Sequence, residues 1–447
     1  MSEKPRPQNS ESSSEHTAHE HAPEIPAPIQ PFSKHFFDRS PAGGVARAIY
    51  FKTMFGGVTA LCVVIFAIFS IYWGSTWKIP DHTLPGWIVD FDGGFVGQGV
   101  SQALAAIDPG SFGIYWEVVP ASQFPGGIAQ LEDAVTGEAV WYGLAINVGS
   151  SANLTAAIAS ATTSYNSSTA ITFLASEARN ENMYPIHRTI AMAQLEGIMQ
   201  QFALKMVHNV SSASNVVTLL SNAPQIVTRP VGYTVNNLRP FDVPVASAVT
   251  FVGLIYLLIL SFFTVMVSSG ARAASGVERT LTLGSLIRLR IATSFVAYFF
   301  LALFYTLLSR AFQLPFDRRF GPGGIVLFWM LNWIGMLACG LALEAMITIL
   351  TIRFVPFFLI LWIISNVSIS IYPLQVLPRI YRYGYAFPFY NIQRVVRTIV
   401  FSTKNDVGLN FGILIVWVAI SCITLPLFQW FVRRPAPSAE RTAVSGV

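Results

Sequence analysis

Charged residues are scarce in this sequence of 447 residues, of which 11% are charged and 53% are hydrophobic. A soluble domain carries about 25% charged residues, so this composition excludes an ordinary soluble protein. The formal net charge is +5, but most arginines flank apolar segments, which is typical of contact with lipid headgroups. We therefore expect membrane lipids as partners and no nucleic acid.

Cysteines and catalytic motifs are also lacking. The three cysteines lie inside apolar runs, which excludes a disulfide framework and a cysteine metal site. The motifs H-E-x-x-H, G-x-S-x-G and C-x-x-C are absent, as is the G-K pair of a P-loop. His82, His187 and His208 show no metal-binding spacing, and we expect surface or capping roles for them. We predict that the protein is not an enzyme and has no cofactor and no metal site.

Large apolar residues are nearly missing from residues 1 to 31, which are rich in Pro, Glu and Ser. This composition cannot bury enough surface to offset chain entropy, so we predict a disordered tail. Its cluster of His16, His19 and His21 would lack the fixed geometry of a metal site. Residues 1 to 50 are expected to be cytoplasmic, with a surface helix between residues 32 and 50.

Long hydrophobic runs are what the sequence has in abundance. A helix that spans a bilayer needs about 20 mostly apolar residues. Six stretches qualify: 54–74, 243–267, 290–308, 324–350, 354–371 and 410–431. We predict an α-helical membrane protein with six transmembrane helices and an α/β extracytoplasmic domain inserted between the first and the second. The expected parts are a first helix at 51–74, the inserted domain at 75–242, a five-helix domain at 243–431 and a cytoplasmic tail at 432–447.

The orientation rests on the insert, which carries more acidic than basic residues and three N-glycosylation sequons. The candidate glycosylation sites are Asn153, Asn166 and Asn209. Because glycans are added on the lumenal or extracellular side, we predict a glycoprotein with cytoplasmic N- and C-termini, in the plasma membrane or an endomembrane. The basic residues divide between both sides of the membrane, so the positive-inside tendency alone does not decide the orientation.

A glycine-rich turn begins the insert, in the segment "GWIVDFDGGFVGQGVSQAL" from Gly86 to Leu104. Dinucleotide binding requires G-x-G-x-x-G after a strand, so that backbone amides face the pyrophosphate. The sequence instead reads G-x-x-G-x-G from Gly94. We therefore interpret the segment as a plain strand, turn and helix.

Longer segments carry a family resemblance. "WIVDFDGGFVGQGVSQAL" and "QLEDAVTGEAVWYGLAINVGSSANLTAAI" resemble the outer domain of ABC-2-type membrane permeases. Over about residues 50 to 432 the chain is similar to the fungal nitrosoguanidine-resistance family, through "NNLRPFDVPVASAVTFVGLIYLLILSFF" and "YPLQVLPRIYRYGYAFPFYNIQ". The resemblance implies an integral membrane protein linked to resistance against toxic compounds. It supplies no catalytic site.

Three polar residues within the predicted spans are candidate transport residues. Glu344 is the one acidic residue in these stretches, and an ionised carboxylate in hydrocarbon is costly. It either couples protons or binds substrate, or it reaches a cytoplasmic water cavity or pairs with Arg353. Asn332 and Asn366 either line a pathway or join helices by hydrogen bonds.

Two further segments are candidate interaction sites. The loop "SSGARAASGVERTLTLGSLIRLR" either lies at anionic lipid or docks a separate ATPase; its candidate docking residues are Glu278, Arg279, Arg288 and Arg290. The segment "YRYGYAFPFYNIQRVVRTIVF" is expected to form a helix in the outer membrane interface, with its arginines at lipid phosphates. Its candidate interface or gate residues are Tyr381, Tyr383, Tyr385, Arg394 and Arg397.

These features together predict the export of apolar small molecules or lipids through an ABC-2 permease-like helix bundle, which would confer resistance to toxic compounds. Two alternatives stay open. One is a non-transporting membrane scaffold or lipid-asymmetry regulator, and the other is the permease subunit of a split ABC exporter. The expected partners are membrane lipids, apolar small molecules, and either a second copy of the chain or a separate ATPase.

Overall fold

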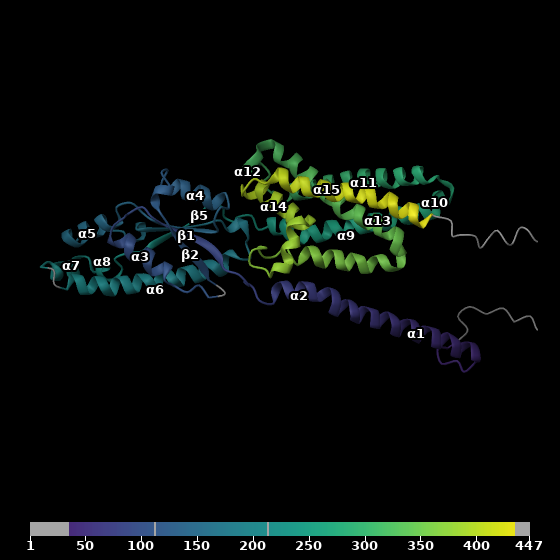
Figure 1. The fold of residues 1–447 in the computed structure, drawn as a ribbon, viewed down its shortest axis with the longest axis horizontal. Helices are drawn as coiled ribbons and strands as arrows, with labels where there is room; N and C mark the ends of the chain where they lie inside the picture. The colour runs from purple at the N-terminus through teal and green to yellow at the C-terminus, as the bar shows by residue number, and fades with distance from the viewer. Residues whose placement is uncertain (1–34, 111–112, 212–213, 434–447) are drawn as a thin grey trace, which may run out of the picture. The chain divides into compact units, whose positions relative to one another are not determined.

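A computed structural model describes residues 35–110, 113–211 and 214–433 (Figure 1). The expected disordered tail, with its three histidines, and residues 434–447 of the expected C-terminal tail lie outside the described residues. The described residues form two compact units, which divide between Cys62 and Val63.

The described part of the first unit is mostly helical. Helix α1 (Pro41–Val64) begins there, preceded by a turn in which the Arg47 guanidinium donates hydrogen bonds to the carbonyl oxygens of Phe36 and Asp38. Within the predicted surface helix at 32–50, residues 41–50 are continuous with the rest of α1; a position of this segment at the membrane surface stays a prediction. No residue of α1 is buried, as expected for an apolar helix surrounded by lipid.

The second unit begins with the rest of the first candidate span, which includes the π-helical turn η1 (Ile65–Phe69) and α2 (Ser70–Thr76). We call residues 77–242, which follow, the α/β domain. Its sheet has the order β2-β1-β3-β4-β5. β3 and β4 are antiparallel, and the other neighbouring pairs are parallel. The strands are β1 (Leu84–Asp90), β2 (Ile114–Val119), β3 (Tyr142–Ile146), β4 (Ile171–Ala175) and β5 (Tyr233–Asn237).

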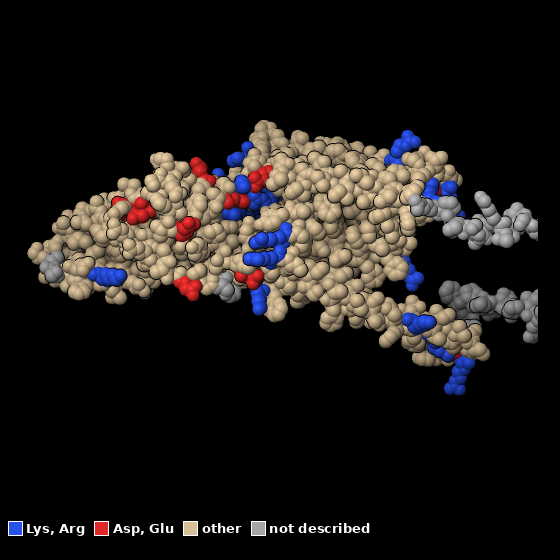
Figure 2. All heavy atoms as spheres, in the orientation of Figure 1, with Lys and Arg blue, Asp and Glu red and all other residues tan. Residues whose placement is uncertain are grey.

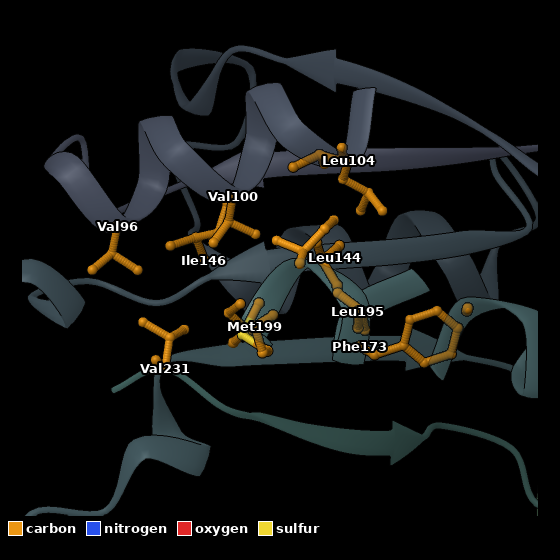
Figure 3. Close-up of a cluster of buried hydrophobic side chains, with 14 of the residues drawn as sticks. Val96, Val100, Leu104, Leu144, Ile146, Phe173, Leu195, Met199 and Val231 are labelled. Atoms are coloured by element: carbon orange, nitrogen blue, oxygen red, sulfur yellow. The ribbon is translucent and has the colours of Figure 1, made fainter. Parts of the chain in front are cut away.

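Helices cover both faces of this sheet, which explains why every residue of β3 is buried. Helix α4 packs on one face, and α3, α5 and α6 lie on the other (Figure 1). Figure 3 shows Val96, Val100 and Leu104 of α3 pointing towards the sheet and towards α6. The domain's helices are α3 (Phe95–Ala105), α4 (Ile128–Thr136), α5 (Ser150–Ser160), α6 (Tyr184–Val210), α7 (Val216–Asn222) and α8 (Pro224–Thr228).

The glycine-rich turn after β1 is filled by side chains of the chain itself. Asp90 Oδ1 accepts hydrogen bonds from the amides of Asp92 and Gly93, and the amide of Val96 donates to the Ser151 hydroxyl. A Cβ at position 97 would lie 2.1 Å from Asp90 Oδ1, so only glycine fits there. The amides that a bound phosphate would use are therefore already paired with protein oxygens.

Residues 243–433 form the helical domain. Its elements begin with the π-helical turn η5 (Ala248–Val252) and include the short segments α10 (Val277–Thr280), α12 (Asp317–Phe320), η6 (Gly321–Gly323) and η7 (Arg379–Ala386). The long helices are α9 (Gly253–Ala274), α11 (Leu283–Ala311), α13 (Gly324–Val367), α14 (Pro388–Phe401) and α15 (Val407–Val432). We call α9, α11, α13 and α15 the bundle.

Five helical stretches among the described residues are long and apolar enough to cross a membrane. They are Pro41–Thr76, Ala248–Ala274, Leu283–Ala311, Asp317–Val367 and Val407–Val432. The protein is therefore an α-helical membrane protein.

Helix α13 is broken at Thr351, whose backbone is not helical (φ 62°, ψ 171°). The part before Thr351 brings Glu344 close to Gln429, near the end of α15. The part after it brings Asn366 to Phe389 at the start of α14, which precedes α15. The chain thus turns back at Thr351, between the predicted stretches 324–350 and 354–371. The count of six spans stays a prediction.

Helix α14 is enclosed by protein. Of its residues, all but Tyr390 and Arg394 are buried, and it packs against α12, α13 and α15 of the helical domain. The prediction of a helix lying in the membrane interface was wrong. An amphipathic helix with arginines on one face suits a lipid surface or an acidic protein surface equally well, and here the α/β domain provides the acidic surface.

Candidate functional site

The buried carboxylate of Glu344 contacts two arginines from neighbouring helices. Its Oε1 atom lies 2.6 Å from Arg290 Nε of α11 and 3.0 Å from Arg272 Nη1 of α9. These side chains are only 1%, 2% and 6% exposed for Glu344, Arg290 and Arg272, respectively. Arg353, which the sequence suggested as a partner, makes no ion pair with Glu344; it lines a cavity beside the cluster.

Arg290 connects three helices of the bundle. Besides its contact with Glu344 Oε1, it donates from Nη2 to the Glu344 carbonyl oxygen over 2.6 Å and from Nη1 to Gln429 Oε1 over 2.5 Å. Arg290 is therefore not available to a docking partner, and that prediction was wrong for this residue. The other candidate docking residues, Glu278, Arg279 and Arg288, are exposed.

The charges in this cluster do not balance, because two guanidinium groups share one carboxylate oxygen. Within the described part of the chain, Arg272 Nε and Glu344 Oε2 are buried without hydrogen-bond partners. The adjoining cavity has a volume of ≈ 370 Å³. We call it the arginine cavity. It lies at the end of the bundle where α9 and α15 end and α11 begins.

The other two candidate transport residues make local hydrogen bonds. Asn332, which is 1% exposed, donates to the Phe328 carbonyl oxygen in its own helix over 2.7 Å. Asn366 is fully buried; it donates to the Trp362 carbonyl oxygen and accepts from the Phe389 amide. Asn366 therefore connects the end of α13 to the start of α14, an arrangement that matches the helix-joining alternative.

At its other end the helical domain meets the α/β domain through a network of ion pairs, in which four basic side chains share the carboxylates of Glu138, Asp406 and Glu181: Arg179, Arg394, Arg397 and Lys404. Arg394 of α14 donates to Glu138 over 2.7 Å and to Asp406 over 2.8 Å. Burial alone would lower the pKa of Arg394, but Glu138, Tyr390 and Asp406 raise it, and the resulting pKa lies above the ordinary value. Glu138 has a φ of 63°, in the left-handed region that is uncommon outside glycine. Its carboxylate contacts Arg394 from this conformation.

Arg397, one turn further along α14, makes a similar contact. It is 5% exposed, donates to the Ala178 carbonyl oxygen over 3.0 Å and pairs with the carboxylate of Glu181. The expected contact of these arginines with lipid phosphates was therefore wrong. Figure 2 shows basic and acidic side chains lying together where the two domains meet, whereas the flank of the bundle in this view is uncharged.

Two of the three candidate gate tyrosines form hydrogen bonds inside the protein. The Tyr381 hydroxyl donates to the Ile71 carbonyl oxygen over 2.7 Å, and the Tyr383 hydroxyl donates to the Ser365 carbonyl oxygen over 3.0 Å. Tyr385 is 42% exposed. A gate that opens through these residues would have to break the first two bonds, and the gate role stays a prediction.

An apolar cavity, which no sequence motif indicated, lies near the same end of the bundle. It has a volume of ≈ 320 Å³, and η5, α9 and α11 contribute to its lining. Its lining residues include Ala248, Gly253, Tyr256, Tyr305, Leu308 and Phe312. The Tyr305 hydroxyl is buried without a hydrogen-bond partner among the described residues. We call this space the apolar cavity.

The α/β domain carries the three sequon asparagines, all of which are exposed: Asn153, Asn166 and Asn209. Their glycosylation stays a prediction. His187 is fully buried, so a surface or capping role was wrong for it. Its Nδ1 lies 3.0 Å from the Tyr142 hydroxyl, and burial lowers its pKa from 6.5 to about 4.

Comparison with known proteins relates the chain to one family and to a yeast membrane protein. Residues 58–423 match a family described as a protein of unknown function, DUF3533. The chain is also 32% identical over 200 residues to an uncharacterized endoplasmic reticulum membrane protein of Saccharomyces cerevisiae; this region is 44% of the chain. It covers 39% of the yeast protein, so the chain spans about two fifths of that relative's length. No solved structure matches the chain significantly.

Proposed function

This chain belongs to the DUF3533 family, and on that premise we propose that it exports apolar small molecules or lipids through its helical domain. Export of this kind would confer resistance to toxic compounds, as the resemblance to nitrosoguanidine-resistance proteins implies. The observation that carries the proposal is the apolar cavity in the flank of the bundle. A cavity of ≈ 320 Å³ is within the range of about 300–1,000 Å³ that small-molecule sites occupy.

The position of the apolar cavity supports entry from the lipid. Three of its lining side chains, Tyr256, Leu308 and Phe312, are 58%, 56% and 65% exposed. Since these residues lie on candidate membrane spans or directly beside them, their exposed surface faces hydrocarbon or its boundary. An apolar molecule dissolved in the bilayer would reach the cavity without crossing water.

The local backbone leaves one polar group for a bound molecule. The cavity is lined by part of η5, a π-helical turn, and such turns are frequent at functional sites. A Cβ at Gly253 would lie 2.1 Å from the Tyr305 hydroxyl oxygen, so the glycine makes room for this hydroxyl. A ligand with a single hydroxyl or carbonyl group would give the Tyr305 hydroxyl the hydrogen bond that it lacks.

Transport in proteoliposomes tests the proposal. Ala248→Phe fills the cavity from an exposed position on η5, and we expect it to abolish the flux of an apolar dye or fluorescent lipid that the wild-type protein supports. Ala419→Phe, which adds the same side chain at an exposed position on α15, is the matched control and should leave the flux unchanged. Equal flux in wild-type and protein-free vesicles, under every gradient and with ATPase added, would exclude export.

The ion pairs between the domains favour a second candidate, a non-transporting scaffold or lipid-asymmetry regulator. Arg394 and Arg397 of α14 hold the α/β domain to the helical domain through two of its carboxylates, those of Glu138 and Glu181. Such pairs would resist the domain movement that many transport cycles use. Normal resistance in cells that carry a disulfide locking these domains together would support the scaffold over the exporter.

The split-exporter alternative depends on the exposed residues Glu278, Arg279 and Arg288. Crosslinking from Arg279 in cells should recover an ATPase if this surface docks one, and should recover lipid alone if it lies at the membrane surface.

The export proposal also includes a topology and two further expectations. The N- and C-termini are cytoplasmic, the α/β domain carries glycans, and the protein has no enzymatic activity. A membrane-impermeant reagent tests this orientation at Asn153, Asn166 and Asn209. If the reagent reaches these positions only from the cytosolic side, the orientation is contradicted.

A further inference from the structure

The arginine cavity has a lining suited to an anion. Its walls come from the ends of α9 and α15, the first part of α11, the break in α13 and Glu278 of α10. They include three arginines and four neutral hydrogen-bonding side chains: Arg272, Arg290, Arg353, Ser269, Thr348, Thr351 and Gln429. Guanidinium groups present planar sets of N–H donors that match the oxygens of phosphate groups.

The charge count at this cavity leaves a positive excess. Glu344 neutralises one of the two buried arginines, Arg272 and Arg290, and Arg353 contributes a third positive charge at the lining. Glu278, which also lines the cavity, offsets one of the remaining charges. One positive charge therefore has no counterpart among the described residues of the site. An uncompensated charge is costly where the surroundings are of low dielectric constant.

Arg272 shows where the missing anion belongs. It is 5% exposed, and its Nε has no hydrogen-bond partner among the described residues. Its Nη1 is already used by Ser268 and Glu344. A buried guanidinium with an unused donor, at the wall of a ≈ 370 Å³ cavity, is a site prepared for an additional acceptor.

The depth of the site favours a phosphate group. Arg290 is seven residues from the start of α11, which places it about 10 Å from that helix end. Lipid phosphates lie at this boundary between helix ends and water. We infer that the arginine cavity binds a phosphate group, carried either by an anionic lipid headgroup or by a soluble phosphate compound. This inference does not depend on export.

Lipid binding to the purified full-length protein in detergent tests the inference. The probes are phosphatidic acid, diacylglycerol as its phosphate-free equivalent, and inorganic phosphate as competitor. We expect phosphatidic acid to bind at least about tenfold more tightly than diacylglycerol. Arg353→Gln should weaken phosphatidic acid binding about tenfold, because it removes an exposed cavity-lining charge without disturbing the buried cluster. Arg279→Gln, at an exposed position on the neighbouring α10, should leave binding unchanged.

The outcomes separate the two sources of phosphate. Displacement of phosphatidic acid by inorganic phosphate would assign the site to a soluble phosphate compound, and binding that resists inorganic phosphate would assign it to a lipid headgroup. Equal affinities for phosphatidic acid and diacylglycerol would overturn the inference, as would equal losses in Arg353→Gln and Arg279→Gln. Thermal unfolding of both variants checks that each is folded.

Discussion

The two ends of the helical domain use arginine in different ways. Beside the α/β domain, Arg394 and Arg397 each have a carboxylate partner, and Arg394 has two. At the opposite end, Arg272 and Arg290 share the single carboxylate of Glu344. Ion pairs at the first end join one domain to another, although Arg179 shares Glu138 with Arg394 there. At the second end two buried arginines depend on one carboxylate beside a cavity that has room for an anion. The comparison separates a structural end from an end with binding capacity.

Removal of Glu344 should have the largest effect. Glu344→Gln leaves two buried arginines without a counter-charge, and we expect a loss of about 3–5 kcal/mol in the free energy of unfolding. Thermal unfolding and protein abundance measure this loss. Glu278→Gln, at an exposed position, is the control and should change neither. Normal abundance of Glu344→Gln combined with lost resistance would instead identify Glu344 as a proton-coupling residue.

A pH effect should distinguish the α/β domain from the bundle. The pKa of His187 falls from 6.5 in the unfolded chain to about 4 in the fold, so between these values the unfolded state binds more protons. Stability should therefore fall as the pH decreases from 6.5 towards 4, by about 3 kcal/mol over the whole window. Unfolding at pH 7.5 and 5 should show a smaller difference in His187→Gln, which cannot titrate; an identical difference would contradict the assignment.

The end beside the α/β domain allows a compensating pair of substitutions, because Arg397 and Glu181 form a pair of one arginine and one carboxylate. Arg397→Met alone leaves Glu181 without its partner, and we expect it to cost about 2 kcal/mol. Adding Glu181→Met removes the unpaired charge and should restore most of that stability, as a double-mutant cycle would show. The corresponding pair at the other end, Arg290→Met with Glu344→Met, should not recover, because Arg272 stays unpaired. Recovery at both ends would refute the distinction between them.

The smallest effect is expected at an exposed ion pair. Asp242 lies 2.8 Å from Arg318, and both side chains are more than one third exposed. The hydrogen bond from Arg318 lowers the pKa of Asp242, but solvent screens such a pair. Asp242→Asn should cost less than about 1 kcal/mol, and added salt should reduce the difference further. A loss as large as that of Arg397→Met would show that burial does not decide the strength of these contacts.

Local patterns in the sequence predicted much of the fold and little of the site. Hydropathy indicated the helices of the bundle, since a span of about 20 apolar residues has few alternatives. The apolar segment at Gly86 and the one at Tyr142 indicated β1 and β3. Asn366 connects α13 to α14, and its role in transport stays a prediction. These features depend on neighbours within a few residues.

The errors concern partners that are distant in sequence. Arg394 and Arg397 pair with residues 256 and 216 positions away, respectively. The sequence of their helix alone therefore could not show whether the arginines face an acidic protein surface or lipid. Arg272 and Gln429 were missed as partners of the Glu344 cluster for the same reason. A partial signal existed, because Arg290 lies one to two turns inside an apolar helix, where a lone charge requires a partner. The apolar cavity had no signal, because most of its lining residues are apolar residues of the kind found throughout the candidate membrane spans.

A cryo-electron microscopy map of the full-length protein in a nanodisc that contains anionic phospholipid would test the contrast between the two ends most directly. The account predicts density for a phosphate group against Arg272 and Arg353, density for an apolar molecule beside Tyr305, and direct ion pairs without a ligand at Arg394 and Arg397. An arginine cavity empty of any anion, or lipid phosphate bound at Arg394 and Arg397, would contradict it.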